Sequence, residues 1–191
     1  MQIILSSKSP RRQELVSKLG YPVSIDPIDA DESFPPNLKA GEIASYLSKK
    51  KSDHYHKTLD TGEVLLTCDT IVWIDERVMN KPENIDEAKQ MLLTLSGKMH
   101  EVYTGVTLKT NKDIITFAEK TEVYFKPLTL AEIDYYINTF KPLDKAGAYG
   151  IQEWIGYIGV EKIVGCYYNV MGLPLSKVYG ELLQILKLPS F

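Results

Sequence analysis

Apolar residues recur with two different periods along the chain, and each period indicates a type of secondary structure. Nearly unbroken apolar runs at 2–7 and 64–74 are typical of buried strands. Residues 100–109 and 114–125 alternate between apolar and polar, and the polar turn at 111–113 between them predicts a β-hairpin. The sequence therefore predicts a sheet that contains both long-range and hairpin pairs.

Apolar residues at helical spacing predict five helices between these strands. Ser9 and Pro10 suit the first positions of the first helix, and Gly20 suits its C-terminal end. The predicted helices cover 10–19, about 40–54, 85–95, 129–140 and 175–186. The predicted loops cover 21–37, 57–62 and 141–152, and short strands are predicted from there to about residue 168. This order of elements indicates an α/β fold with a mixed β-sheet flanked by helices.

The composition favours a single globular domain over residues 1–191. Hydrophobic residues make up 44% of the chain and the net charge at pH 7 is only −3, values that exclude a disordered chain. A chain of this length buries roughly 70% of its unfolded surface, which is enough for a core. No apolar stretch reaches the roughly 18 residues of a membrane span, so we expect no membrane association. The first residues do not read as a signal peptide.

The cysteines and the net charge limit the classes of partner and the compartment. Cys68 and Cys166 are too few for a disulfide framework or a zinc cluster, which predicts a reduced, cytoplasmic protein. A mildly acidic chain is not typical of proteins that bind long nucleic acids. We therefore expect no nucleic-acid polymer as a partner.

The segment 6–12 is the first candidate for chemistry. It places three serines, a lysine and the adjacent Arg11 and Arg12 at a predicted helix start, where free N–H groups attract anions. Two arginines at this end of a helix oppose its dipole unless an anion is bound, and guanidinium groups suit phosphate oxygens. The segment fits either a phosphate site or an ordinary capped surface helix.

Asp69 is the second candidate, because it interrupts an apolar strand. A buried carboxylate costs several kcal/mol unless it is paired or binds a metal. An active site explains its position, with Asp69 as a metal ligand or a general base. The alternative is an exposed strand end or a hydrogen-bonded turn.

Several other polar segments are weaker candidates. An acidic loop ending at Glu32 offers a second carboxylate, although such loops are usually only solvated. The lysine run 49–51 is more typical of a solvated helix face than of a phosphate site. Pro82 keeps the preceding Lys81 in an extended segment, and Gln152 offers both a donor and an acceptor to a base edge.

Missing motifs narrow the chemistry further. The chain has no P-loop, no dinucleotide-binding glycine motif and no nucleophile elbow. Its histidines have no metal-ligand spacing, and we expect His54 and His56 on the surface. Cations and carboxylates remain, which suits metal-assisted attack of water on a phosphate chain.

Several sequence motifs, spread over nearly the whole chain, resemble in kind and in order those of the Maf family of nucleotide pyrophosphatases, the septum-formation inhibitors. They are SSKSPRRQEL at the start, DES at 31–33, CDTIVW around Asp69, NKPENIDEAKQMLLTLSGKMHEVYTGV, DKAGAYGIQ, and GCYYNVMGLPL. The resemblance implies an elongated α/β fold with two lobes around a central cleft, similar to that of the inosine-triphosphate pyrophosphatases and Ham1 proteins. It also implies hydrolysis of a nucleoside triphosphate to the monophosphate and pyrophosphate with a divalent metal, Mg²⁺ or Mn²⁺.

The resemblance also assigns roles to individual residues. Asp69 corresponds to the family's catalytic proton acceptor and, with Glu32, to its metal site, while Lys51 and Lys81 correspond to active-site lysines. The phosphate-binding residues by this comparison are Ser7, Arg11 and Arg12. The residues tied to substrate choice are Arg12, Thr70 and Gln152.

The loop DKAGAYGIQ is similar to that of the branch acting on dTTP and UTP. Glu153 stands where glycine is usual in the family, and Cys68 where alanine is usual. A homodimer is a further expectation, since the family often forms dimers. Two alternatives stay open, a non-catalytic nucleotide-binding regulator of septum formation and a phosphatase that releases orthophosphate.

Overall fold

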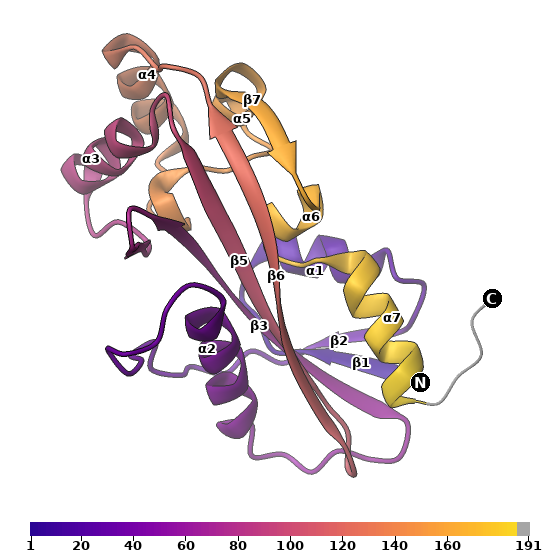
Figure 1. Cartoon of the computed structure of the whole chain (residues 1–191). Coiled ribbons are helices and arrows are strands. Elements are labelled where there is room, and N and C mark those ends of the chain that lie inside the picture. Colours follow the sequence, from indigo (N-terminus) through magenta and orange to yellow (C-terminus); the bar gives the residue numbers. More distant parts are fainter. Residues whose placement is uncertain (187–191) are drawn as a thin grey trace. The chain divides into compact units, whose positions relative to one another are not determined.

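The computed structural model describes residues 1–186, and their strands form one mixed sheet (Figure 1). Residues 187–191 of the predicted domain lie outside this described part. The strands are β1 (Gln2–Leu5), β2 (Val23–Ile25), β3 (Glu63–Ile74), β4 (Arg77–Met79), β5 (Met99–Lys109), β6 (Ile114–Phe125) and β7 (Val160–Val164). Their order is β2-β1-β3-β5-β6-β7, with β4 paired to β3. The pairs β1–β2 and β1–β3 are parallel, whereas β3–β4 and β6–β7 are antiparallel.

The helices confirm most of the predicted segments. They are α1 (Pro10–Ser17), α2 (Gly41–Asp53), α3 (Ile85–Leu95), α4 (Leu130–Phe140), the short 3₁₀ helix η1 (Ala146–Ala148), α5 (Trp154–Gly159), α6 (Tyr167–Val170) and α7 (Leu175–Ile185). The predicted capping box is present at Thr129 and Glu132, where each side chain accepts from the other residue's backbone N–H. Among residues 1–186, no helix combines the length and the apolar character that a membrane crossing requires.

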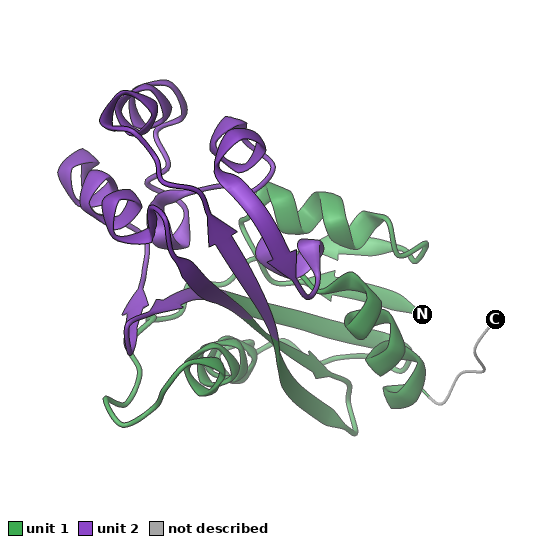
Figure 2. Cartoon of the chain, turned by 45° about the horizontal axis from the view of Figure 1, so that its top comes forward, with its two compact units in different colours: residues 1–69, 104–119, 172–191 green, residues 70–103, 120–171 purple. Residues whose placement is uncertain are grey.

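The chain divides into two compact units, each assembled from separate segments (Figure 2). Unit 1 contains 1–69, 104–119 and the chain from 172 onward, and unit 2 contains 70–103 and 120–171. β3, β5 and β6 each contribute residues to both units. The single domain over 1–191 stays a prediction.

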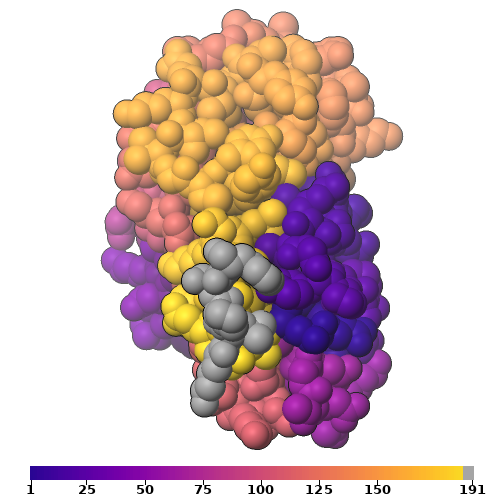
Figure 3. All heavy atoms as spheres, turned by 90° about the vertical axis from the view of Figure 1, so that its right-hand side faces the viewer, coloured from indigo at the N-terminus to yellow at the C-terminus, as the bar shows by residue number. Residues whose placement is uncertain are grey.

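Unit 1 is organised around β1, which lies between its two parallel neighbours. Ile3 is opposite Val23 of β2 on one side and Val64 of β3 on the other. Helix α7 lies beside the N-terminal segment (Figure 3), where the rings of Tyr21 and Tyr179 stack with centroids 6.5 Å apart. The strands of unit 1 are therefore covered by elements that are distant in the sequence.

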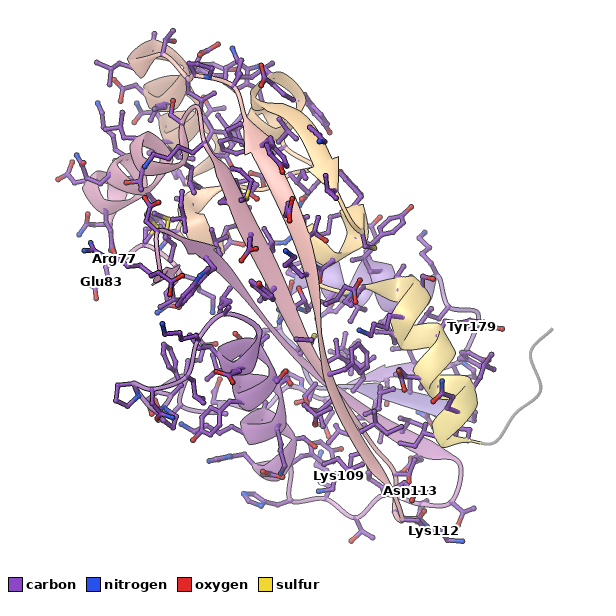
Figure 4. All side chains as sticks on the ribbon, viewed as in Figure 1. Arg77, Glu83, Lys109, Lys112, Asp113 and Tyr179 are labelled. Atoms are coloured by element: carbon purple, nitrogen blue, oxygen red, sulfur yellow. The ribbon has the colours of Figure 1, made fainter. Side chains whose placement is uncertain are left out.

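The predicted hairpin is confirmed, and its turn lies in unit 1. β5 and β6 are neighbours in the sheet, and the backbone N–H of Thr110 donates to the carbonyl of Asp113 at 2.8 Å. Lys109, Lys112 and Asp113 gather at this end of the two strands (Figure 4). Charged and polar side chains at a turn of this kind keep it in solvent.

Unit 2 has its own apolar core, to which α3, α4, α5 and the strands β3, β5 and β6 contribute buried residues. Ala88, Leu92 and Leu95 of α3 are completely buried there, as the helical spacing predicts. Ile85, the first residue of the predicted apolar stripe, is 40% exposed because it lies at the open N-terminal end of the helix. An ion pair between Lys89 and Asp134, 2.6 Å apart, joins α3 to α4.

The segment 21–37 is mostly loop, as predicted, although Val23–Ile25 forms β2, a strand too short to show a periodic pattern. Another predicted segment is wrong in part. The short strands predicted up to residue 168 include only β7, because α5 and α6 occupy the rest. In α5, a Cβ atom on Gly156 would lie 1.9 Å from the carbonyl oxygen of Ile151, so the close approach needs glycine.

His100 is buried in the core of unit 2 and is 1% exposed. Its Nε2 lies 2.8 Å from the hydroxyl of Tyr149, and its Nδ1 has no hydrogen-bond partner among the described residues. The rings of Phe125 and Tyr149 meet the imidazole edge to face, with centroids 5.1 and 5.4 Å away. Burial lowers the pKa of His100 from 6.5 to about 3, so the folded protein keeps this ring neutral.

We predict that the free energy of unfolding falls as the pH falls below 6.5, the ordinary pKa of the ring. The unfolded chain binds a proton there while the folded chain does not, so each pH unit costs up to about 1.4 kcal/mol. Urea unfolding of the wild type and of His100→Phe between about pH 7 and pH 5 measures this slope. The variant is expected to lose most of it, and an unchanged slope would contradict the prediction.

Candidate active site

The carboxylate of Asp69 and the ammonium of Lys51 meet in unit 1, where α2 lies against β3. Asp69 is 7% exposed within the buried strand, as its position in an apolar run predicts. Nζ of Lys51 donates to Oδ1 of Asp69 in a direct ion pair. The same Nζ lies 3.0 Å from Oε1 of Glu32, which the loop between β2 and α2 carries. One ammonium thus joins two predicted metal-binding carboxylates.

A hydrogen bond close to this ion pair fixes the position of α2 relative to β3. The hydroxyl of Thr67 donates to the carbonyl oxygen of Ser48 at 2.7 Å. Thr67 is two residues before Asp69 and therefore on the same face of β3, while Ser48 is three residues before Lys51 and on the same side of α2. The bond aligns strand and helix so that Lys51 reaches Asp69.

Glycine at position 105 lets α2 approach the sheet closely enough for this contact. A Cβ atom on Gly105 of β5 would lie 2.0 Å from the carbonyl oxygen of Ala44 in α2. The helix backbone therefore rests directly on the strand. On the same helix, the hydroxyl of Ser48 lies 3.1 Å from that of Thr107, also in β5.

Arg12 reaches the same region from α1, through contacts with backbone. Its Nη1 donates to the carbonyl oxygen of Cys68 and its Nε to that of Gly172, each at 3.0 Å. Cys68 immediately precedes Asp69, so the guanidinium group fixes the strand where the carboxylate projects. Arg12, which is predicted to bind phosphate, therefore also has a structural role.

The opening turn of α1 carries the residues of the predicted anion site. Pro10 is the first residue of the helix and no acidic residue lies in its first turn, so Arg11 and Arg12 face an uncompensated positive helix end. Ser9 is the N-cap residue, but its side chain makes no capping hydrogen bond. The Oγ of Ser7 instead accepts from the backbone N–H of Ser9 at 3.2 Å, which fixes the turn.

Charge pairing sets the protonation of Lys51. Burial works to lower the pKa of Lys51, but the carboxylates of Asp69 and Glu32 outweigh it, and the net pKa is raised. Lys51 therefore stays cationic. Burial raises the pKa of the Cys68 thiol, which keeps this cysteine protonated and a poor nucleophile, in line with a reaction that needs no covalent intermediate.

The structure brings together Arg12, Glu32, Lys51 and Asp69, and it places Ser7 and Arg11 at the start of α1 in the same unit. The other predicted residues, Thr70, Lys81 and Gln152, belong to unit 2. Thr70 follows Asp69 in β3 and lies on the opposite face of the strand. Lys81 is exposed just after β4, and Gln152 lies in the turn before α5.

A buried ionic network holds the loop that carries Gln152. Lys145 is only 7% exposed and pairs with Asp144 at 2.7 Å and with Glu153 at 3.1 Å. The hydroxyl of Tyr136 donates to Oε2 of Glu153 and accepts from the backbone N–H of Gly150 at 3.0 Å. Glu153 therefore fixes the loop through these two contacts.

Sequence reasoning missed two kinds of supporting residue. Lys50 and Asp31 form an ion pair with 2.8 Å between Nζ and Oδ2, and Lys145 pairs with Glu153 in unit 2. The sequence shows the run of three lysines and the unusual Glu153, but their spacing does not indicate which residues they pair with. The exposed positions of His54 and His56 are confirmed.

The carboxylates of Asp69 and Glu32 can hold a divalent cation only if the substrate supplies the remaining ligands. Within residues 1–186, no group of three or more His, Cys, Asp or Glu residues is arranged to hold a metal ion. Asp69 and Glu32 nevertheless both contact one ammonium, so two carboxylates already converge on one point of positive charge. Mg²⁺ bound with a triphosphate needs one or two protein carboxylates, and the phosphates supply the other ligands.

The chain is similar to known proteins in sequence and in fold. A family model described as Maf-like protein matches residues 2–185. A dTTP/UTP pyrophosphatase of Bacteroides thetaiotaomicron is 52% identical over 186 residues, and one of Phocaeicola vulgatus is 51% identical over 185 residues, with 96% of each chain covered in both cases. The solved structure of the Staphylococcus aureus Ham1 protein has a TM-score of 0.50 at 14% identity and covers 95% of this chain and 100% of its own. This last likeness confirms the predicted Ham1-like fold.

We predict that Gly105→Ala lowers the free energy of unfolding by about 1–3 kcal/mol or more, because the added methyl group forces α2 away from β5. Gly180→Ala is the matched control, since a Cβ atom there meets nothing within 4 Å and alanine favours the helix α7. Chemical denaturation of the two variants measures the difference. Equal stability of both variants would show that α2 does not depend on this contact.

Proposed function

The chain belongs to the Maf family, and on that premise we propose that it hydrolyses dTTP and UTP to the nucleoside monophosphate and pyrophosphate. Two relatives that are about half identical over nearly their full lengths carry the name dTTP/UTP pyrophosphatase. The reaction is hydrolysis of an acid anhydride by water. Its substrate is a small nucleotide and not a nucleic-acid polymer.

The observation that carries this proposal is the ion pair of Asp69 and Lys51 with Glu32 beside it. A carboxylate 7% exposed within a strand is retained at a cost in stability, and its partner is a lysine that also contacts a second carboxylate. An arrangement of this kind suits a reaction in which the negative charge of a substrate increases. A purely structural strand does not need it.

In the proposed mechanism, Asp69 orients a water molecule and accepts its proton as that water attacks the α-phosphorus. Asp69 and Glu32 would together hold a divalent cation, Mg²⁺ or Mn²⁺, which when bound neutralises charge on the phosphate oxygens. Lys51 keeps its positive charge next to both carboxylates, and it stabilises the negative charge that accumulates on the leaving pyrophosphate.

The phosphate chain is assigned to the remaining cations and the opening turn. Ser7, Arg11 and Arg12 present a hydroxyl and guanidinium groups at the positive end of α1. Lys81 is proposed to supply a further positive charge to the phosphate chain. Arg12, Thr70 and Gln152 are proposed to select the nucleobase. The amide of Gln152 has the donor and acceptor that the edge of thymine or uracil requires.

The compartment, the oligomeric state and the physiological role are further parts of this proposal. Cys68 and Cys166 are both free thiols, which supports a reducing, cytoplasmic location. We also propose a homodimer. A part in septum formation would follow from control of the nucleotide supply, and a regulator that binds nucleotides without cleaving them is the alternative.

We predict that Asp69→Asn lowers kcat by at least about 10²–10⁴-fold on dTTP with Mg²⁺, because the amide cannot accept the proton. The products of the wild type, separated by ion-exchange chromatography, are expected to be dTMP and pyrophosphate. Asp53→Asn is the matched control, since Asp53 is an exposed residue of α2. It should retain full activity.

Each possible product decides between the candidate functions. Orthophosphate in place of pyrophosphate would identify a phosphatase. Binding of dTTP with no product in the wild type would favour the regulator. Near-normal turnover by a folded Asp69→Asn protein would remove Asp69 from the mechanism.

A further inference from the structure

Three consecutive lysines in the last turns of α2 make three different sets of contacts. Lys49 pairs with Asp53 on its own helix at 2.7 Å, and both side chains are 51% exposed. Lys51 contacts Asp69 and Glu32. Lys50 lies between them and is directed to the loop at 26–40, which joins β2 to α2. Successive residues of a helix project about 100° apart, so the three lysines point in three different directions.

Lys50 uses its ammonium group on the two residues that flank Glu32. Its Nζ lies 2.8 Å from Oδ2 of Asp31, 2.9 Å from the carbonyl oxygen of Ser33 and 3.1 Å from the hydroxyl oxygen of Ser33. An ammonium group has three N–H donors, so these three acceptors match its capacity. The Lys50 side chain is only 18% exposed, which distinguishes it from Lys49.

The two flanking residues are also bonded to each other across Glu32. The carboxylate of Asp31 accepts from the backbone N–H of Ser33 at 3.0 Å and from the hydroxyl of Ser33. Asp31, Ser33 and Lys50 therefore form a closed set of hydrogen bonds, which we call the Lys50 clamp. The backbone of Glu32 lies inside this set.

Glu32 lies on a segment without regular secondary structure. Its side chain is 48% exposed and makes an ion pair with Lys51, whose own side chain is 15% exposed. The loop 26–40 contains no helix or strand that would fix its path. Catalytic groups must stay within about 0.5 Å of the productive geometry, so the loop that carries Glu32 must itself be held in place.

We propose that Lys50 is a positioning residue, which through Asp31 and Ser33 holds Glu32 beside Lys51 and Asp69. This inference rests on the proposed function only for the role of Glu32 at the metal. The Lys50 clamp holds the loop in the nucleotide-free protein and does not depend on that function. Lys50 touches no reacting atom, and its effect on the reaction passes through Glu32.

The first test follows the loop without any nucleotide. Lys50→Met keeps most of the aliphatic stem and removes the ammonium group, and Lys49→Met is the matched control on the same helix. Amide hydrogen exchange across residues 31–33 is expected to speed up at least about tenfold in Lys50→Met and to stay unchanged in Lys49→Met. Asp31→Asn tests the clamp from the loop side and should give the same acceleration. Unchanged exchange in both clamp variants would overturn the proposal.

The second test asks whether Lys50 acts only through Glu32. Mn²⁺ binding to the nucleotide-free protein, measured by electron paramagnetic resonance, is expected to weaken several-fold in Lys50→Met and in Glu32→Gln. In a double-mutant cycle on kcat/KM for dTTP, Lys50→Met should cost about tenfold alone and almost nothing in the Glu32→Gln background. Additive losses would overturn the positioning role. If the wild type shows no turnover, the proposed function fails while hydrogen exchange and Mn²⁺ binding still decide this proposal.

Discussion

The need to neutralise Asp69 inside a buried strand is the constraint on which the rest of unit 1 depends. Removing one partner of a buried ion pair costs about 3–5 kcal/mol, because the other charge is left without compensation. Lys51 is that partner, and it comes from α2, the element directly before β3 in the chain. The helix must therefore approach the sheet closely and in one register.

Several otherwise unrelated features follow from this requirement. Gly105 removes the side chain that would keep α2 away from β5, and the bond from Thr67 to Ser48 sets the register between strand and helix. Arg12 ties the carbonyl of Cys68, the residue before Asp69, to α1. Backbone and side-chain contacts thus share the task of holding one carboxylate, and the preorganised charge is what a phosphate substrate would meet.

Unit 2 uses the same physical rule for a different purpose. Lys145 is almost completely buried and pairs with Asp144 and Glu153, while Tyr136 donates to Glu153. The network supports a loop, and no strand carboxylate is involved in it. His100 shows the other solution to burial, since it lacks a charged partner and keeps a neutral ring. The charge of Lys145 is paired, whereas His100 carries no charge. Both arrangements avoid an unpaired charge in the protein interior, which would be costly.

The sequence by itself determined the elements whose pattern is local. Periodicity predicted β3, the hairpin of β5 and β6, and the helices α2, α3, α4 and α7, and an acid within an apolar run singled out Asp69. Family motifs then pointed to Glu32 and Lys51. Only the tertiary structure decided that β2 is a strand, that Lys50 and not Lys49 holds the loop, and that Gly105 supports a helix. Each of these depends on contacts between residues distant in the sequence, and no local pattern of apolar and polar residues records such contacts.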